Sequence, residues 1–444
     1  MTEPVAGESH LISPSRSLGV LAASGWAAVS ALAVSVVAAR VLDTPDYTQF
    51  LVYWSVLFGC FQVLSGLQNE AARAVSVTGL RDTSVDGPAR PFPRVLVMTL
   101  ILAGAVAVAV ALLAPWWTTR LDVGFFLLVV SVTVVVGYGC HLTLVGTLAG
   151  RREWGTMAAL SAAEATVRMA VVLLVAFVIP GLTSMRLAAA FPALTWILFV
   201  LVVPRARRAT GARADVGLKQ LLANGAWAML AAASAAVLIN GFPALARAAL
   251  GGATPGLVGI LLGVQLTRAP ILMPLGAFQG VAIAGFVAAK QGRLKALLKP
   301  LAAVFGIGVV LAVVVGLVGP WVMALLYGNQ YALTHLALGG LAFAAVSIAL
   351  LTLTGAATIA VGQHKFFVVG WVVGAAATVA LLFALPILGV DRVIASVFIG
   401  PLVGMVVHVI AIRRHDRETA TERPPSDPSG LTQAQPSSTY TGEL

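Results

Sequence analysis

Charged residues are scarce in this chain. Only 10% of its 444 residues are Asp, Glu, Lys or Arg, while 59% are hydrophobic. A soluble domain carries roughly 25% charged residues, so this composition cannot cover a water-exposed surface. Apolar runs recur instead from Leu18 to Ile412, and they have the length of about 20 residues that a helix needs to cross a hydrocarbon core of roughly 30 Å. The sequence therefore predicts a membrane protein.

Cysteine is equally scarce, since Cys60 and Cys140 are the only two. Both fall inside apolar runs, which predicts buried thiols and neither a disulfide framework nor a cysteine-based metal site. The sequence also lacks a Walker A motif, a Gly-rich nucleotide loop and a metal-ligand cluster, which argues against ATP hydrolysis by this chain. We expect no cofactor. The energy for the activity must then come from an ion gradient, the membrane potential or removal of product.

The apolar runs are continuous, whereas the strands of a membrane β-barrel would appear as short segments of alternating polarity. The expected fold is an all-α integral membrane bundle of about twelve transmembrane helices. The predicted spans, with an error of several residues at each boundary, are 18–39, 48–68, 95–114, 122–149, 154–179, 185–203, 219–242, 256–288, 301–326, 332–361, 366–387 and 391–412.

The basic residues predict the orientation of these spans. Most of the 28 Lys and Arg residues fall in segments that are cytoplasmic if the N terminus is cytoplasmic. The positive-inside rule therefore places both termini in the cytoplasm and predicts a multi-pass protein of the cytoplasmic membrane. Because these residues lie between apolar runs and not on one face of a soluble domain, the net charge of +11 does not predict a nucleic-acid partner. The remaining, outer segments contain only Arg40, Arg120, Arg186, Arg247 and Arg392.

Two similar segments indicate an internal repeat. The first predicted helix ends in AARVLDTPDYTQF and the seventh in LARAALGGATPGL, so that Arg40 corresponds to Arg247 and Pro45 to Pro255. Six helices separate the copies, which gives them the same orientation and predicts two parallel six-helix lobes. A proline that opens a helix after a short loop is also common without any repeat.

The repeat divides the chain into five parts. Residues 413–444 are rich in Pro, Ser and Thr without apolar periodicity and are expected to be a disordered cytoplasmic tail. The other parts are a cytoplasmic N-terminal tail at 1–17, a first lobe at 18–203, a basic cytoplasmic linker at 204–218 and a second lobe at 219–412.

Several segments resemble a known family. ARVLDTPDYTQF is similar to the R-x-L-G-P-x-x-Y/F-G turn of the polysaccharide and lipid-linked oligosaccharide flippases, within the multidrug/oligosaccharidyl-lipid/polysaccharide (MOP) exporter superfamily. TLAGRREWGTMAAL resembles the turn between their fourth and fifth helices, and LLYGNQYALTHLAL the turn before their tenth. Asp43 and Thr48 stand where the family usually has Gly.

The resemblance implies alternating access of two six-helix lobes around a central cavity. It also implies transport of a polyprenyl-diphosphate-linked glycan from the inner to the outer leaflet, with membrane lipids and glycan-assembly proteins as further partners. A chain with this role belongs to polysaccharide biosynthesis of the cell envelope and is not an enzyme.

Ionisable side chains in mid-span are candidates for the substrate site, because each costs at least about 2.5 kcal/mol to insert. Arg268 lies about twelve residues into the eighth span, roughly 18 Å along its axis, and a guanidinium matches a diphosphate. A pair with a carboxylate or carbonyl of another helix is the alternative. Glu164 and Arg168 stand one turn apart and can pair with each other. The alternative is that Arg168 contacts phosphate or sugar and Glu164 takes up a coupling proton. Gln265 and Asn240 are candidates for sugar hydroxyls, although such amides more often link helices.

Other residues are candidates for coupling, gating or bending. His141 can titrate in a proton relay or serve only in packing. Glu70 and Arg73, at the cytoplasmic end of the second span, form either a gate or an interface pair. Pro270 and Pro274 follow Arg268 and remove backbone donors, as expected of a hinge.

Two other functions fit parts of the sequence. A drug or small-cation exporter of the same superfamily would share the fold, but one mid-span acid against two arginines favours an anionic substrate. A membrane glycosyltransferase would use Asp43 and Asp46 as a catalytic acid pair, but the remaining outer loops are too short to build an acceptor site.

Overall fold

The computed structural model describes residues 14–81, 93–121, 123–251, 254, 256–268, 293–360 and 363–421. The first half consists of α1 (Pro14–Val41), α2 (Thr44–Arg81), α3 (Val95–Leu112), α4 (Ala114–Leu121), α5 (Phe125–Gly150), α6 (Trp154–Val178), α7 (Leu182–Ala190), η1 (Phe191–Leu194) and α8 (Thr195–Val202). The second half consists of α10 (Leu218–Leu238), α11 (Phe242–Leu250), the helix Leu257–Arg268, α13 (Arg293–Tyr327), η2 (Asn329–Tyr331), α14 (His335–Ala360), α15 (His364–Ala384) and α16 (Gly389–Thr421).

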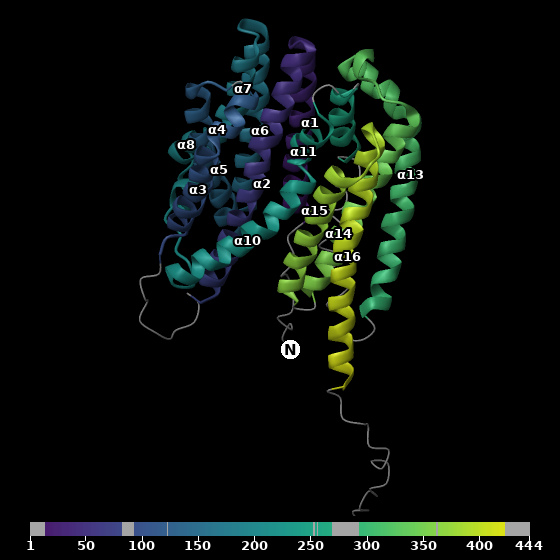
Figure 1. Ribbon diagram of the computed structural model, residues 1–444. Coiled ribbons are helices and arrows are strands. Elements are labelled where there is room, and N and C mark those ends of the chain that lie inside the picture. The colour runs from purple at the N-terminus through teal and green to yellow at the C-terminus, as the bar shows by residue number, and fades with distance from the viewer. Residues whose placement is uncertain are drawn as a thin grey trace, which may run out of the picture.

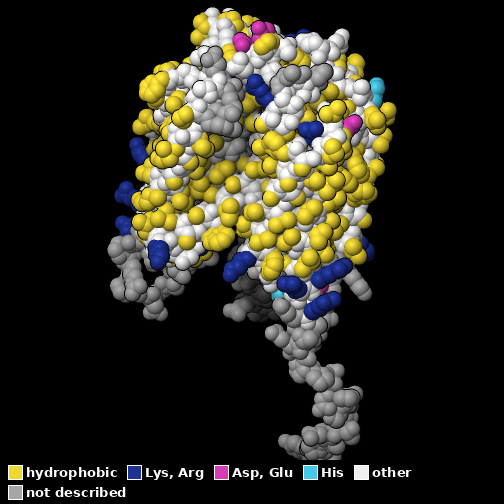
Figure 2. Space-filling model, in the orientation of Figure 1, with side chains coloured by type: hydrophobic (Ala, Val, Ile, Leu, Met, Phe, Trp, Pro, Cys, Tyr) yellow, Lys and Arg dark blue, Asp and Glu magenta, His cyan; other side chains and the backbone are white. Residues whose placement is uncertain are grey.

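The predicted all-α membrane fold is confirmed. Within the described ranges, eleven helices are long and apolar enough to span a membrane, and β pairing is limited to an isolated bridge between Arg94 and Arg213. Large apolar side chains such as Phe125 and Phe177 are more than four-fifths exposed, as expected where lipid is the solvent. Hydrophobic side chains cover most of the face in Figure 2, and many Lys and Arg side chains lie along its lower edge. The chain is a multi-pass membrane protein.

The helices form two groups with α10 between them. Figure 1 shows α2–α8 on one side, α13–α16 on the other, and α10 running obliquely from the first group toward the middle. α10 packs mainly on α2, and less extensively on α15. The helix that begins the second half of the sequence is therefore attached largely to the first half.

Small residues permit this packing. A Cβ atom at Gly66 of α2 would lie 2.3 Å from the backbone nitrogen of Met229 in α10. Likewise, a Cβ at Gly146 would lie 2.1 Å from the carbonyl oxygen of Gln68. Gly146 and Gly150 of α5 thus allow close approach to α2, in agreement with their GxxxG spacing.

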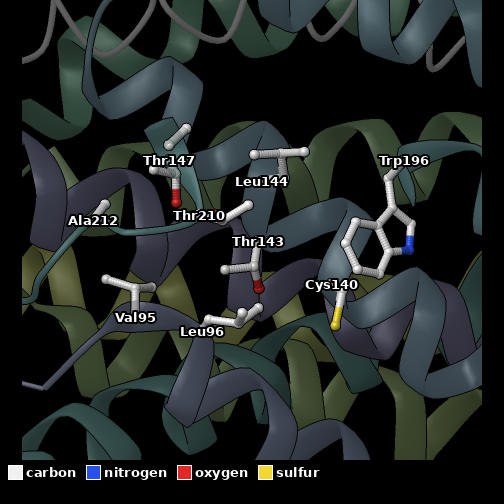
Figure 3. A pocket seen from close by; sticks show the side chains of 10 residues that line it. Val95, Leu96, Cys140, Thr143, Leu144, Thr147, Trp196, Thr210 and Ala212 are labelled. Carbon is white, nitrogen blue, oxygen red and sulfur yellow. The ribbon is translucent and has the colours of Figure 1, made fainter. Parts of the chain in front are cut away.

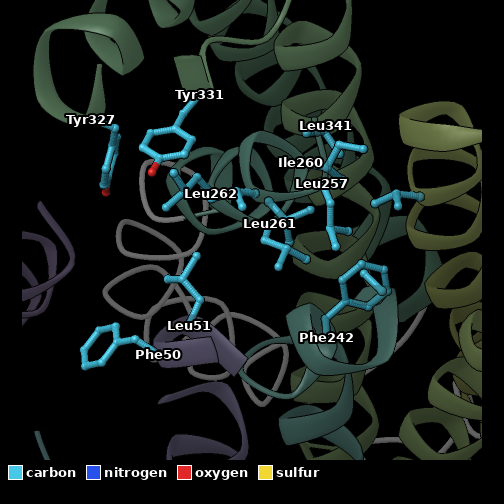
Figure 4. Packing of buried hydrophobic residues seen from close by; sticks show 14 of the residues in the cluster. Phe50, Leu51, Phe242, Leu257, Ile260, Leu261, Leu262, Tyr327, Tyr331 and Leu341 are labelled. Carbon is cyan, nitrogen blue, oxygen red and sulfur yellow. The ribbon is translucent and has the colours of Figure 1, made fainter. Parts of the chain in front are cut away.

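The two halves meet at the predicted outer end. Arg40 Nε donates to the carbonyl of Leu326 at 3.1 Å, and the hydroxyls of Thr44 and Tyr331 are 3.1 Å apart. The rings of Tyr47 and Tyr331 lie 5.8 Å apart. A hydrophobic cluster continues this contact inward, and Figure 4 shows members from both halves around the helix Leu257–Arg268. At this predicted outer end, the described parts of the two halves are therefore in contact.

Several predicted boundaries were wrong. α2 continues to Arg81 because its polar end packs against the 210–217 segment. α16 runs to Thr421, so residues 413–421 are helical and not disordered. Part of the predicted linker forms a short helix, α9 (Pro204–Ala209). The predicted span 256–288 is described only as Leu257–Arg268, and the hinge candidates Pro270 and Pro274 lie outside the described residues.

Candidate transport site at the broken seventh span

The seventh predicted span, 219–242, ends where α10 gives way to α11, and the chain is not helical from Ile239 to Gly241. Local sequence explains the break, because Asn240 and Gly241 are poor helix formers. Pro243 also lacks an N–H and its ring excludes the carbonyl four residues earlier, which is that of Ile239. The backbone nitrogens of Asn240 and Gly241 both donate to Ala236, at 3.1 and 2.7 Å. The carbonyl of Ile239 is left without a helical donor.

Arg268 fills this position. Its Nη1 donates to the Ile239 carbonyl at 2.7 Å, and its guanidinium carbon lies 4.9 Å from the centre of the Phe242 ring. The residue is only 5% exposed, and within the described part of the chain its Nη2 has no hydrogen-bond partner. The sequence contains no Asp or Glu between residues 216 and 390. The second half therefore has a buried cation that no nearby segment of its own sequence can neutralise with a carboxylate.

Asn240 fixes the break against α2. Its Nδ2 donates to Gln62 Oε1 at 3.2 Å, and Ser55 Oγ donates to its carbonyl at 2.5 Å. Ser55, Gly59, Gln62 and Gly66 recur at helical spacing and form the face of α2 that meets α10 and the break. The predicted candidates Asn240 and Arg268 are thus brought to the same helix break. Gln265 is half-buried, one turn before Arg268.

Arg168 occupies a different environment in the first half. It forms an ion pair with Glu164, one turn earlier on α6, and both side chains are 6% exposed. Its guanidinium carbon lies 4.7 Å from the centre of the Phe58 ring on α2. The pair that the i,i+4 spacing predicts is present, and it leaves this position electrically neutral.

A row of neighbouring rings runs from Phe58 to His141, tilted at the first contact and stacked at the next two. Phe58 and Phe61 have ring centroids 5.3 Å apart, Phe61 and Tyr138 3.9 Å, and Tyr138 and His141 5.2 Å. His141 is 3% exposed, and among the described residues its Nδ1 has no hydrogen-bond partner. Among the described residues, no hydrogen bond connects His141 to the Glu164–Arg168 pair.

Glu70 and Arg73 belong to a larger network near the predicted inner end. Arg73 donates to both carboxylate oxygens of Glu70, at 2.8 and 2.6 Å, and to both of Asp215, each at 2.9 Å. Asn224 of α10 adds a bond of 3.2 Å to Glu70. The network therefore ties α2 to the linker and to α10. Sequence reasoning missed Asp215, because nothing local relates it to a residue 142 positions earlier.

Arg186 was wrongly placed in an outer loop. It lies within α7 and is 1% exposed, with Nη2 donating to Gln49 Oε1 at 3.1 Å and the guanidinium carbon 5.6 Å from the Tyr53 ring centre. The signal was available, since position 186 falls inside the span predicted for residues 185–203. A buried histidine of the second half, His408, was also missed; its ring nitrogens lie 3.1 Å from Thr354 Oγ1 and 3.1 Å from the carbonyl of Phe367.

Asp43, one member of the hypothetical catalytic acid pair, has a structural role. Its Oδ1 accepts a hydrogen bond of 2.8 Å from the backbone N–H of Asp46, in the first turn of α2. This is the geometry of a helix N-cap. The aspartate accepts this backbone hydrogen bond at the position where the similar turn of the polysaccharide flippases usually has Gly.

The fold is that of the MOP superfamily transporters. Over 92% of this chain and 96% of the other, it matches the outward-facing structure of a multidrug resistance MATE family transporter with a TM-score of 0.64 and 16% identity. A MOP superfamily transporter from Pyrococcus furiosus, described by the reverse polarity of its binding pocket, matches with a TM-score of 0.62 and 14% identity over 92% and 95% of the two chains. These identities establish a shared fold.

The sequence relatives are mycobacterial. The uncharacterized protein Rv3630 of Mycobacterium tuberculosis H37Rv is 36% identical over 398 residues, which cover 88% of this chain and 91% of that protein. Rv1510 of the same strain is 35% identical over 403 residues, with 88% and 90% coverage. The chain belongs to the same family as Rv3630 and Rv1510. No family model matches the sequence.

Proposed function

We propose that this protein is a transporter that moves a lipid-linked oligosaccharide or polysaccharide precursor across the cytoplasmic membrane by alternating access. The observation that carries the proposal is Arg268, a buried guanidinium held by one main-chain carbonyl and one aromatic ring. A polyprenyl diphosphate supplies the anion that the second half lacks, and its phosphate oxygens match the donors of a guanidinium. The break at Ile239 supports the same position, because it exposes the main-chain carbonyl that Arg268 contacts.

Alternating access requires that the contacts between the halves open and close. The outer contact through Arg40, Thr44 and Tyr331 involves hydrogen bonds to carbonyl and hydroxyl groups, with no ion pair among them. Each of these bonds contributes about 1 to 3 kcal/mol, and the hydrophobic cluster that joins the halves adds to the cost of opening the outer end. We propose that it opens when the bound diphosphate moves to the outer leaflet.

The test is leaflet translocation of a lipid-linked oligosaccharide in reconstituted vesicles at equal protein incorporation. We expect Arg268→Ala to lower the rate by about tenfold or more, the equivalent of losing one charge-assisted contact. Arg392→Ala is the control, because Arg392 also donates to main-chain carbonyls, those of Ile387 at 2.5 Å and Ala249 at 3.4 Å, but lies at the start of α16. An unchanged rate in Arg268→Ala would contradict the proposal.

A drug or small-cation exporter is the second candidate, favoured by the multidrug transporters among the fold neighbours. A cation site needs an available carboxylate, and Glu164, the mid-span acid, is paired with Arg168. Absence of glycan translocation together with cation efflux that Glu164→Gln abolishes would move the assignment to this branch.

A further inference from the structure

Arg247 is a second cation of the second half with an unused buried donor. It lies in the last turn of α11, and the ion pairs among the described residues do not include it. Within the same residues, its Nη1 is buried and has no hydrogen-bond partner. The last turn of a helix favours a cation, and a snorkelling arginine keeps its guanidinium at the membrane surface. Neither effect accounts for an N–H donor that is enclosed by protein and unpaired.

Arg40 occupies the corresponding position of the predicted repeat and is bonded differently. Its Nε and Nη2 donate to the carbonyls of Leu326 and Leu325, at 3.1 and 2.5 Å. Arg392, at the same end of the second half as Arg247, also donates to two main-chain carbonyls. In the part of the chain that the structure describes, Nη1 of Arg247 has no such carbonyl. Burying a donor without an acceptor is unfavourable, and an anion would supply the missing acceptor.

The helix α11 connects Arg247 to the site of Arg268. α11 begins at Phe242, whose ring centre lies 4.9 Å from the guanidinium carbon of Arg268, and Figure 4 shows this ring next to the helix Leu257–Arg268. Arg247 follows Phe242 by roughly 7.5 Å along the helix axis, toward the predicted outer end. Its neighbour Ala246 belongs to the hydrophobic cluster that joins the two halves there. The two arginines therefore lie one after the other between the helix break and the outer contact.

The cavity in the first half is too small for a substrate. Figure 3 shows this cavity among α3, α5, α8 and the end of α9, with uncharged lining residues such as Cys140, Thr143 and Thr147. Its volume of about 10 Å³ has room for roughly one water molecule. This cavity is therefore no stop for a phosphate group, whereas Arg247 lies beside the cluster that must separate when the outer end opens.

We propose that Arg247 is a second binding position for the phosphate groups of the substrate, occupied after Arg268 as the outer contact opens. This inference rests on the proposed function. A diphosphate that leaves Arg268 would otherwise lose its counter-charge inside the membrane, which is costly. The Arg247 guanidinium supplies new donors that match phosphate oxygens. Successive sites of moderate strength allow a charged solute to leave as well as to enter.

The test is leaflet translocation of a lipid-linked oligosaccharide in reconstituted vesicles over a range of substrate concentrations. We expect Arg247→Gln to lower the maximal rate about tenfold, the equivalent of one charge-assisted contact. The half-saturating concentration should not change, because Arg247 acts after the substrate is loaded. Arg268→Gln should instead raise the half-saturating concentration. Arg247→Lys keeps the charge and should retain part of the rate.

Arg392→Gln is the matched control and should keep the wild-type rate, because it removes the same charge at the same end from a guanidinium that is bonded to carbonyls. An equal loss of rate in this control would overturn the proposal in favour of a general effect of outer charge. An unchanged maximal rate in Arg247→Gln, beside a loss in Arg268→Gln, would overturn the second position and leave the proposed function intact. A wild type that translocates no lipid-linked oligosaccharide would overturn both.

Thermal unfolding separates binding from a structural role. Nη1 of Arg247 has no partner to lose among the described residues, so Arg247→Gln should unfold at the same temperature as the wild type. A lower melting temperature that accounts for the loss of rate would assign Arg247 to the fold and overturn the proposal.

Discussion

Arg168 and Arg268 are both buried in the membrane region but are held in different ways. Each guanidinium lies over an aromatic ring, at 4.7 Å from Phe58 and 4.9 Å from Phe242. Arg168 has a carboxylate partner on its own helix, whereas Arg268 has the carbonyl that a helix break exposes. The first half thus buries a neutral pair, and the second half buries a net positive charge. Since such a charge is costly in hydrocarbon, the comparison favours Arg268 as the place where an anion binds.

The largest expected effect is a difference in the free energy of unfolding between the alanine variants of the two arginines. Arg168→Ala leaves Glu164 buried without its cation, and we expect a loss of about 3–5 kcal/mol in the free energy of unfolding. Arg268→Ala removes a charge that no carboxylate of the described residues balances, and we expect a loss of only about 1 kcal/mol. Denaturation of the purified protein in mixed micelles measures both values.

The control for this comparison is the double variant Glu164→Gln and Arg168→Gln. It removes the pair without leaving a lone charge and should recover most of the stability lost in Arg168→Ala. Equal losses in Arg168→Ala and Arg268→Ala would break the comparison, because they would mean that both arginines serve the fold alike.

The next effect concerns the helix that carries the break. Gly66→Ala places a Cβ 2.3 Å from the Met229 backbone and should separate α2 from α10, at a cost of about 1–3 kcal/mol. Because Ser55 and Gln62 on the same face hold Asn240, transport should fall with stability. Gly104→Ala is the control, since no atom lies within 4 Å of its added Cβ. Comparable melting temperatures for the two variants would refute this packing.

A smaller effect is expected for the network at the predicted inner end. Arg73→Ala removes the cation between Glu70 and Asp215, which are 5% and 6% exposed. We expect a loss of about 2 kcal/mol, less than for Arg168→Ala, because the Arg73 side chain is 40% exposed and water screens its ion pairs. Arg73→Lys should retain part of the stability. A loss as large as that of Arg168→Ala would show that exposure does not distinguish the two sites.

The smallest expected effect is at the outer turn. Asp43→Ala removes the N-cap of α2 and should cost about 1 kcal/mol, while Asp43→Asn should cost less because the amide oxygen still accepts the bond. Transport should survive Asp43→Asn. Loss of all activity in Asp43→Asn at unchanged thermal stability would show that the Asp43 carboxylate takes part in the activity and does not only cap α2.

Much of the fold could be predicted because its main cause is local. A run of about 20 apolar residues is sufficient to specify a membrane helix, and the predicted spans that correspond to α3, α5, α6, α7 with α8, α14 and α15 lie close to the observed helices. The boundaries failed where polar residues extend a helix beyond the apolar run, as in α2 to Arg81 and α16 to Thr421. Hydrophobicity does not report such extensions.

The candidate site was predictable only in part. The Glu164–Arg168 pair follows from i,i+4 spacing, whereas the pairing of Arg73 with Asp215 joins residues that only the fold brings together. The break at Ile239 was missed, although Asn240, Gly241 and Pro243 contain its local cause, because the run of apolar residues continues through it. Arg268 was found as a charge in a span, but its carbonyl partner depends on that break.

The most direct test of the central claim is binding of a polyprenyl diphosphate against the corresponding polyprenol to the purified protein. We predict that the wild type prefers the diphosphate and that the neutral double variant Glu164→Gln and Arg168→Gln keeps this preference. Arg268→Gln should lose the preference by about tenfold, the value of one charge-assisted contact. An Arg268→Gln protein that binds the diphosphate as selectively as the wild type would contradict the assignment of Arg268 as the anion site.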